Sequence, residues 1–173
     1  GVLAFQMPIH RINAIMTGER SWAEDGLGAS GESYLIGPDL TMRSLSRALI
    51  EDAEAYEAAL RANGADEQTI GRIVALGTTI GLQPVETPSA QAAIAGETGV
   101  RTVTDYRGVE VLSTYAPLDI PGVTWGILAE KDVAEAYAAA TQMAQTIGWW
   151  ALLILALALG LGYVITRPIT RPD

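Results

Sequence analysis

The sequence predicts an α+β fold: an antiparallel five-stranded sheet with helices on one side, followed by a long helix that continues into a single transmembrane span. Short runs rich in Val, Ile, Thr and Tyr are separated by turn residues, which is typical of strands. Alanine-rich runs with capping residues lie between them and favour helices. Residues 147–165 carry no charge at all, which favours a membrane helix.

The first elements are expected within residues 1–46. Residues 1–7 have the pattern of a buried strand, and residues 8–16 place isoleucines on one side of a short helix. A hairpin is predicted from strands at 33–37 and 40–46, because Gly37, Pro38 and Asp39 favour a turn between them.

The stretch GLGASG at 26–31 fits the pattern G-x-G-x-x-G. A dinucleotide-binding loop needs a strand before these glycines and a helix after them. Here polar, turn-rich residues come first and strand-like residues follow, so we expect a flexible entry into the sheet. Nucleotide binding is the alternative interpretation.

Three helices and three strands complete the predicted domain. The helices are expected at 52–64, 66–77 and 87–96, and the strands at 99–106, 109–118 and 123–132. Asp66 and Thr87 are the expected N-caps, with Pro88 in the first turn and Gly77 at a helix end.

One rigid helix is predicted from about residue 133 to 166. The residues before the span are good helix formers, and Asp132 with Glu135 has the spacing of a capping box. Its length would be roughly 50 Å, and Pro168 would end or kink it.

Residues 147–165 are long enough, at roughly 28 Å, to cross a bilayer. The side chains expected at its interfaces are Trp149, Trp150, Tyr163, Arg167 and Arg171. The arginines follow the span, so the positive-inside rule places the C-terminus in the cytoplasm and the large N-terminal part in the periplasm or the extracellular space. The small residues expected to favour close helix packing are Ala156, Ala158, Gly160 and Gly162.

Composition excludes several classes of function. Twenty acidic against 11 basic residues give a net charge of −9, which argues against nucleic-acid binding. The chain has no Cys and a single His, His10, so thiolate and histidine metal sites are excluded. No pattern predicts catalytic residues, a metal or a cofactor, and we expect no enzyme activity.

A small-molecule cavity is the functional prediction with most support. The polar and aromatic residues on predicted strands that could line it are Tyr34, Arg43, Ser46, Tyr106, Tyr115 and Trp125. Arg43 would pair with a carboxylate-containing ligand. The alternative is that the aromatic rings only pack in the core and that Arg43 binds nearby carbonyl or acidic groups.

Three stretches carry a family resemblance: TGERSWAEDGLGASGESYLIGPDLTMRSLSR at 17–47, DYRGVEVLSTYAPLDIPGVTWGILAEKDVAEAY at 105–137, and ITRPI at 165–169. They resemble the membrane-proximal lobe of a double Cache, PAS-like sensor domain and the start of a HAMP linker, as in bacterial chemotaxis transducers, sensor kinases and membrane-bound cyclases.

The resemblance implies five parts. These are a remnant of a membrane-distal lobe at 1–24, the Cache-like extracytoplasmic domain at 25–132, a helical stalk at 133–146, the transmembrane helix at 147–166 and a cytoplasmic HAMP start at 167–173. It implies a receptor fragment of the bacterial inner membrane, with its N-terminal domain in the periplasm. This fragment would bind a small molecule and relay the signal through the membrane helix.

The alternative is a truncated, sensor-derived accessory subunit that braces a photosynthetic or respiratory membrane complex. The expected partners are the lipid bilayer and either other membrane-protein subunits or a second copy of the chain.

Overall fold

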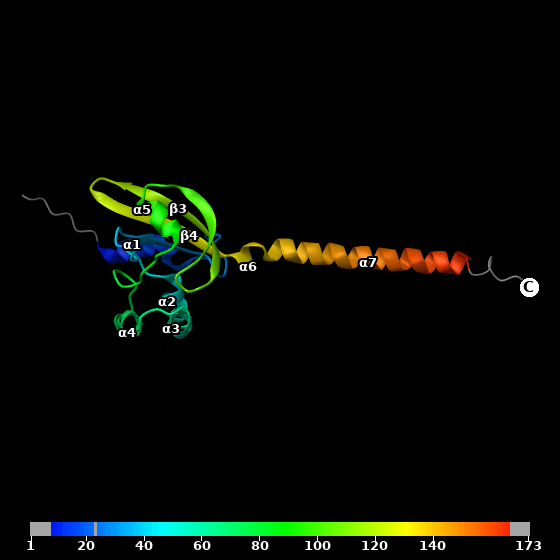
Figure 1. Cartoon of the computed structure of the whole chain (residues 1–173), viewed down its shortest axis with the longest axis horizontal. Coiled ribbons are helices and arrows are strands. Elements are labelled where there is room, and N and C mark those ends of the chain that lie inside the picture. The colour runs from blue at the N-terminus through cyan, green and yellow to red at the C-terminus, as the bar shows by residue number, and fades with distance from the viewer. Residues whose placement is uncertain (1–7, 23, 167–173) are drawn as a thin grey trace, which may run out of the picture. The chain divides into compact units, whose positions relative to one another are not determined.

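The computed structural model describes residues 8–22 and 24–166 (Figure 1). The strand expected at 1–7, the HAMP start at 167–173, and with it Arg167 and Arg171, lie outside these residues. The chain divides into two units, one ending at Ala136 and the other beginning at Tyr137.

The first unit holds most of the helices and strands. In chain order it contains α1 (Ile9–Met16), the 3₁₀ turn η1 (Gly18–Arg20), β1 (Glu32–Ile36), α2 (Arg47–Glu51), α3 (Ala53–Ala62), α4 (Glu67–Leu76), α5 (Pro88–Ile94), β2 (Gly99–Thr104), β3 (Glu110–Ile120), β4 (Val123–Asp132) and α6 (Val133–Ala136). The α+β class is therefore confirmed.

The sheet is antiparallel, with the strand order β1-β4-β3-β2. Glu32 of β1 lies opposite Glu130 of β4, and Leu118 of β3 lies opposite Trp125 of β4. Because side chains alternate between the two faces of a strand, Glu32, Tyr34 and Ile36 share one face of β1. That face is the core face.

The prediction of a fifth strand at 40–46 is wrong. This segment makes only isolated bridges, from Met42 to Ile36 and from Thr41 to Pro84. Leu40 has a φ of 57°, which is not strand geometry. The backbone N–H of Arg43 donates to β1, whereas that of Met42 donates to Gln83, so no single strand receives the ladder.

Helix α5 packs against β2, β3 and β4 on the core face (Figure 1). Gly126 of β4 permits this close approach, since a Cβ there would collide with Ala93. Helix α1 lies at the opposite face of β1, where the Ser33 hydroxyl donates to the Met16 carbonyl at 2.9 Å. The sequence predicted helices on only one side of the sheet. In the structure α5 and α1 lie on opposite faces.

Three of the predicted helix ends, at Asp66, Thr87 and Gly77, are confirmed. The carboxylate of Asp66 accepts from the Thr69 N–H at 2.8 Å, and the Thr87 hydroxyl accepts from the Ala90 N–H at 3.2 Å. Gly77 ends α4 in the left-handed conformation, with a φ of 61°. Each such cap satisfies backbone groups that the helix end leaves open.

The core joins the sheet to the helices. Its buried members are Tyr34, Ile36, Met42, Leu49, Tyr56, Leu60, Ile70, Ile73, Val85, Ala90, Ala92, Ala93, Tyr106, Tyr115 and Leu128. Each large apolar side chain buried in this way contributes about 1.5–3 kcal/mol relative to exposure.

The second unit is described by α7 (Ala138–Thr166). Within it Thr141–Val164 is long and apolar enough to span a membrane, with a mean hydropathy of 2.1, and none of it is buried. A single continuous helix from 133 to 166 is not observed, because α6 ends at Ala136 and Tyr137 lies in a turn.

Candidate functional site

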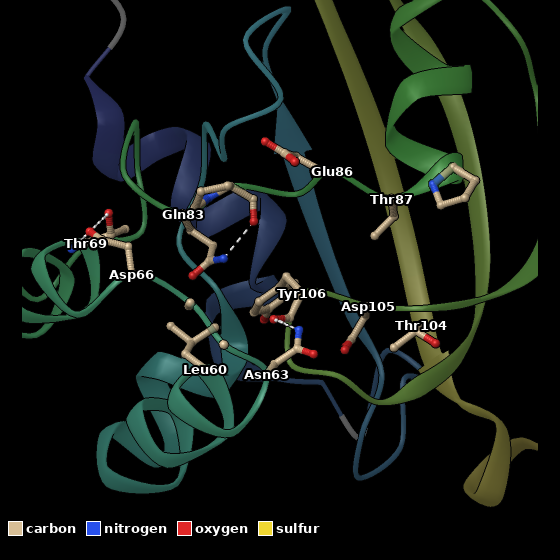
Figure 2. Close-up of a pocket in the computed structure, with 14 residues that line it drawn as sticks. Leu60, Asn63, Asp66, Thr69, Gln83, Glu86, Thr87, Thr104, Asp105 and Tyr106 are labelled. Carbon is tan, nitrogen blue, oxygen red and sulfur yellow. Dashed lines mark hydrogen bonds between the residues drawn. The ribbon is translucent and has the colours of Figure 1, made fainter.

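A cavity of about 480 Å³ opens beside the end of β2 (Figure 2). It lies among the end of α3, the start of α4, the segment before α5 and the turn after β2. Its lining residues are Leu60, Asn63, Gly64, Ala65, Asp66, Thr69, Gln83, Pro84, Glu86, Thr87, Pro88, Thr104, Asp105 and Tyr106.

Internal hydrogen bonds hold several of these lining side chains in place. The Asn63 amide donates to the Tyr106 carbonyl at 3.1 Å, which fixes the end of α3 to the turn after β2 (Figure 2). The buried Gln83 side chain donates to the Pro84 carbonyl and accepts from the Tyr56 hydroxyl. The cavity is therefore largely pre-formed, which is usual for a small-molecule site.

Acidic groups dominate the charge of this lining. It includes Asp66, Glu86 and Asp105 and contains no Lys or Arg. Asp66 caps α4 and the buried Asp105 is paired with Arg107 at 2.6 Å, whereas Glu86 is exposed. A ligand with a positive charge or with neutral polar groups fits this lining better than an anion.

Tyr106 joins the cavity to a buried polar network. Its hydroxyl donates to Glu32 Oε1 at 2.7 Å, and the Arg47 N–H donates to Glu32 Oε2 at 3.0 Å. The Ser46 hydroxyl lies 2.7 Å from the Tyr106 oxygen and 3.2 Å from Glu32 Oε2. Since it has one proton, Ser46 donates to one of these two groups at a time.

Glu130 is the second buried carboxyl of the network. Its Oε2 accepts from the Tyr34 hydroxyl at 2.8 Å. Burial raises the pKa of Glu130 to about 7, against the lowering effect of the nearby Ser113 and Tyr34 hydroxyls. Burial also raises the pKa of Glu32, although the Tyr106 hydroxyl and the Arg107 charge lower it.

A second cavity, of about 250 Å³, lies between the loop at 26–31 and helices α2 and α3. Its lining residues are Ala29, Ser30, Glu32, Arg47, Ala48, Glu51, Asp52, Ala55, Tyr56, Ala59, Arg107 and Val109. Its guanidinium groups are already engaged: Arg107 with Asp105 and Asp132, and Arg47 with Glu51.

The loop at 26–31 binds a carboxylate of the same chain. The Ala29 and Ser30 N–H groups donate to Glu135 of α6 at 3.1 and 2.7 Å, and the Ser30 hydroxyl donates to it at 2.5 Å. These donors, the Ser30 hydroxyl first, lower the pKa of Glu135 to about 2. Lys131 adds an ion pair at 3.2 Å.

Two earlier expectations are thereby corrected. The loop is not a flexible entry into the sheet, because Arg47 also donates to the Gly28 and Gly31 carbonyls, at 3.0 and 2.6 Å. The capping box of Asp132 and Glu135 does not form, because Asp132 pairs with Arg107 at 3.0 Å and Glu135 binds the loop.

Three of the six predicted ligand-binding residues lie together. Tyr34, Ser46 and Tyr106 are buried around Glu32 and Glu130, and of these only Tyr106 lines the larger cavity. Glu32 and Glu130 were missed. The sequence pattern that could have revealed them is the two-residue period of a strand. It puts Glu32 on the same face as Tyr34, and Glu130 on the same face as Leu128.

The other three predicted residues lie elsewhere. Arg43 pairs with Asp39 at 2.7 Å and lines neither cavity. Tyr115 packs under the Arg101 guanidinium, 4.6 Å from the ring centre, and its hydroxyl accepts from Arg101. Trp125 is half-buried on β4.

The predicted membrane residues with described positions all lie on α7. Trp149, Trp150 and Tyr163 are exposed, as are the small residues Ala156, Ala158, Gly160 and Gly162. Among residues 8–22 and 24–166, no three His, Cys, Asp or Glu side chains are grouped so that they could hold a metal ion.

Comparison with models of known protein families found no match, and comparison with curated proteins found none either.

Proposed function

We propose that the unit ending at Ala136 is the extracytoplasmic sensory domain of a bacterial transmembrane receptor, and that it binds a small molecule in the larger cavity. One observation supports this most directly: Tyr106 both lines the cavity and donates to Glu32, whose cross-strand partner Glu130 lies on β4. Strand β4 leads directly into α6, so occupancy of the cavity has a bonded route to the strand that precedes the membrane helix.

The sequence predicted a carboxylate-containing ligand, to be recognised by Arg43. The acidic lining favours a small amine or a neutral polar molecule instead, since no cation of the lining would neutralise a carboxylate. A screen should therefore contain amines, polyols and carboxylates of matched size.

The test is a thermal-shift screen of the full chain in detergent, followed by two matched variants. Thr104 and Thr102 are exposed on the same face of β2, but only Thr104 lines the cavity. We expect Thr104→Trp to abolish the shift given by a ligand and Thr102→Trp to keep it. A ligand that binds both variants equally well occupies another site.

The orientation proposed for α7 places the first unit in the periplasm and the C-terminus in the cytoplasm. Because the chain has no Cys, single cysteines can report this directly. A membrane-impermeant maleimide should label Thr102→Cys in spheroplasts, and label Thr170→Cys only after permeabilisation. The reverse pattern would refute the orientation.

The second candidate function is an accessory subunit that braces a larger membrane complex. The observation in its favour is that the apolar stretch Thr141–Val164 is unburied within the chain, so its surface is open to lipid or to other helices. Ala156 and Gly160 would permit close helix contact. Native mass spectrometry of the protein extracted in mild detergent distinguishes the two functions: a stable larger assembly without a signalling module favours the brace.

A further inference from the structure

Two buried carboxyl groups lie on neighbouring strands, at the core face of the β1–β4 pair. Glu32 and Glu130 are direct cross-strand partners on β1 and β4, and each is only 2% exposed. Side chains that face each other in an antiparallel pair have Cβ atoms about 4.5–5.5 Å apart. Two ionised carboxylates on such neighbouring side chains, away from water, repel each other, so one of the pair favours its protonated form.

The hydrogen bonds indicate that Glu32 is the ionised member. Its two oxygens accept from the Tyr106 hydroxyl and the Arg47 N–H, and in one orientation also from the Ser46 hydroxyl. Donors on both oxygens stabilise the charged form of a carboxyl group.

Glu130 is surrounded differently. Its Oε1 is buried without a hydrogen-bond partner, although its Oε2 accepts from Tyr34. Ser113, directly opposite on β3, has a buried hydroxyl that also lacks a partner. A buried oxygen that carries negative charge but receives no hydrogen bond is costly, so Oε1 favours its protonated form.

The surrounding charges leave a second negative charge uncompensated. The titratable and charged groups packed around the pair are Tyr34 on β1, Asp132 on β4, Asp105, Tyr106 and Arg107 in the turn after β2, Arg47 on α2 and Tyr56 on α3. Arg107 already pairs with Asp105 and Asp132, and Arg47 pairs with Glu51. Helix α5 contributes no titratable group.

We propose that the Glu32–Glu130 pair is a proton-binding site, which takes up one proton on Glu130 Oε1 as the surrounding pH falls. Glu130 stands two residues before the end of β4, where α6 begins, so the charge change occurs on the strand that leads toward the membrane helix. This inference does not depend on a ligand in the larger cavity. The raised pKa of Glu130, about 7, agrees with it.

Infrared difference spectroscopy of the full chain in detergent tests the proposal, because a protonated carboxylic acid has its own carbonyl band. We expect this band to grow in the wild type with a midpoint of about pH 7, whereas the ordinary pKa of a glutamate is 4.5. Glu130→Gln should remove the band. Glu110→Gln, at an exposed position on β3, should leave it unchanged.

A wild type without such a band above about pH 6, or a Glu130→Gln variant that keeps it, overturns the proposal. Ser113→Ala provides a second test that does not depend on the folding of Glu130→Gln. The Ser113 hydroxyl lowers the pKa of Glu130, so its removal should move the midpoint to higher pH. An unchanged midpoint would overturn the assignment to Glu130.

Discussion

At the scale of single residues, Tyr106 has two roles. The residue lines the larger cavity, and its hydroxyl donates to the carboxyl group of Glu32, a residue that is 2% exposed. A hydrogen bond to a buried charged group contributes more than one between neutral groups, because the charge has no water to replace the lost donor. The position therefore links stability of the core to the state of the cavity.

Tyr106→Phe should lower the free energy of unfolding by about 1–3 kcal/mol, since it leaves one oxygen of Glu32 without its donor. Tyr137→Phe is the matched control, as the Tyr137 ring is 55% exposed and should change the free energy by less than about 0.5 kcal/mol. Denaturant unfolding of the full chain in detergent measures both. Equal effects would show that the Tyr106–Glu32 bond does not stabilise the domain.

At the scale of elements, the contact between the glycine-rich loop and α6 can be tested with two glycines. Gly28 and Gly26 both have positive φ angles, 67° and 79°. A Cβ at Gly28 would collide with the Glu135 carboxylate, whereas one at Gly26 would meet nothing within 4 Å. Both alanine variants share the cost of the left-handed backbone, about 1–2 kcal/mol.

Gly28→Ala should therefore lower the melting temperature further than Gly26→Ala, because it also displaces Glu135 from the Ala29 and Ser30 N–H groups. In a Glu135→Ala background the two glycine variants should become equivalent. Thermal unfolding of the four variants measures this coupling. Additive effects would mean that the loop does not hold α6 through this carboxylate.

The elements that sequence predicted well are those decided by local chemistry. Two helices begin at the N-caps Asp66 and Thr87, and α4 ends at Gly77. Each of these residues bonds to a residue three or four positions away, so such caps can be recognised in a single stretch of sequence. The predictions that were wrong depended on hydrogen bonds between residues far apart in the sequence. Residues 40–46 divide their backbone hydrogen bonds between β1 and Gln83, which no local pattern predicts.

The candidate site was predicted only in part, because it too depends on contacts between distant parts of the sequence. Alternation placed Tyr34 on the inner face of its strand, but only the pairing of β1 with β4 sets Glu32 against Glu130. Register between strands 90 and more residues apart depends on the whole fold. Likewise, the predicted capping box does not form, because the Glu135 carboxylate accepts from the Ala29 and Ser30 N–H groups. These residues lie over a hundred positions earlier in the chain.

At the scale of the whole molecule, the carboxyl groups of Glu135 and Glu130 make the free energy of unfolding depend on pH in opposite directions. Glu135 has a lowered pKa, about 2, so its contribution is present above its ordinary pKa of 4.5 and is lost as the pH falls toward 2. Glu130 has a raised pKa, about 7, so the folded state binds its proton more tightly than the unfolded state does. Its contribution is present below pH 4.5 and is lost as the pH rises through 7.

The domain should therefore be most stable at acidic pH, near 4.5 to 5, and lose on the order of 3 kcal/mol between there and pH 8 through Glu130. The raised pKa of Glu32 acts in the same direction. The net charge of −9 at pH 7 adds repulsion on the alkaline side, because the pI is about 4.5.

Urea unfolding of the full chain in detergent across this pH range measures the loss. Glu130→Gln should flatten most of the alkaline slope while leaving the acid limb, which Glu135 controls, in place. A slope that persists in Glu130→Gln would assign the alkaline loss to general charge repulsion, and the buried pair would then have no special part in it.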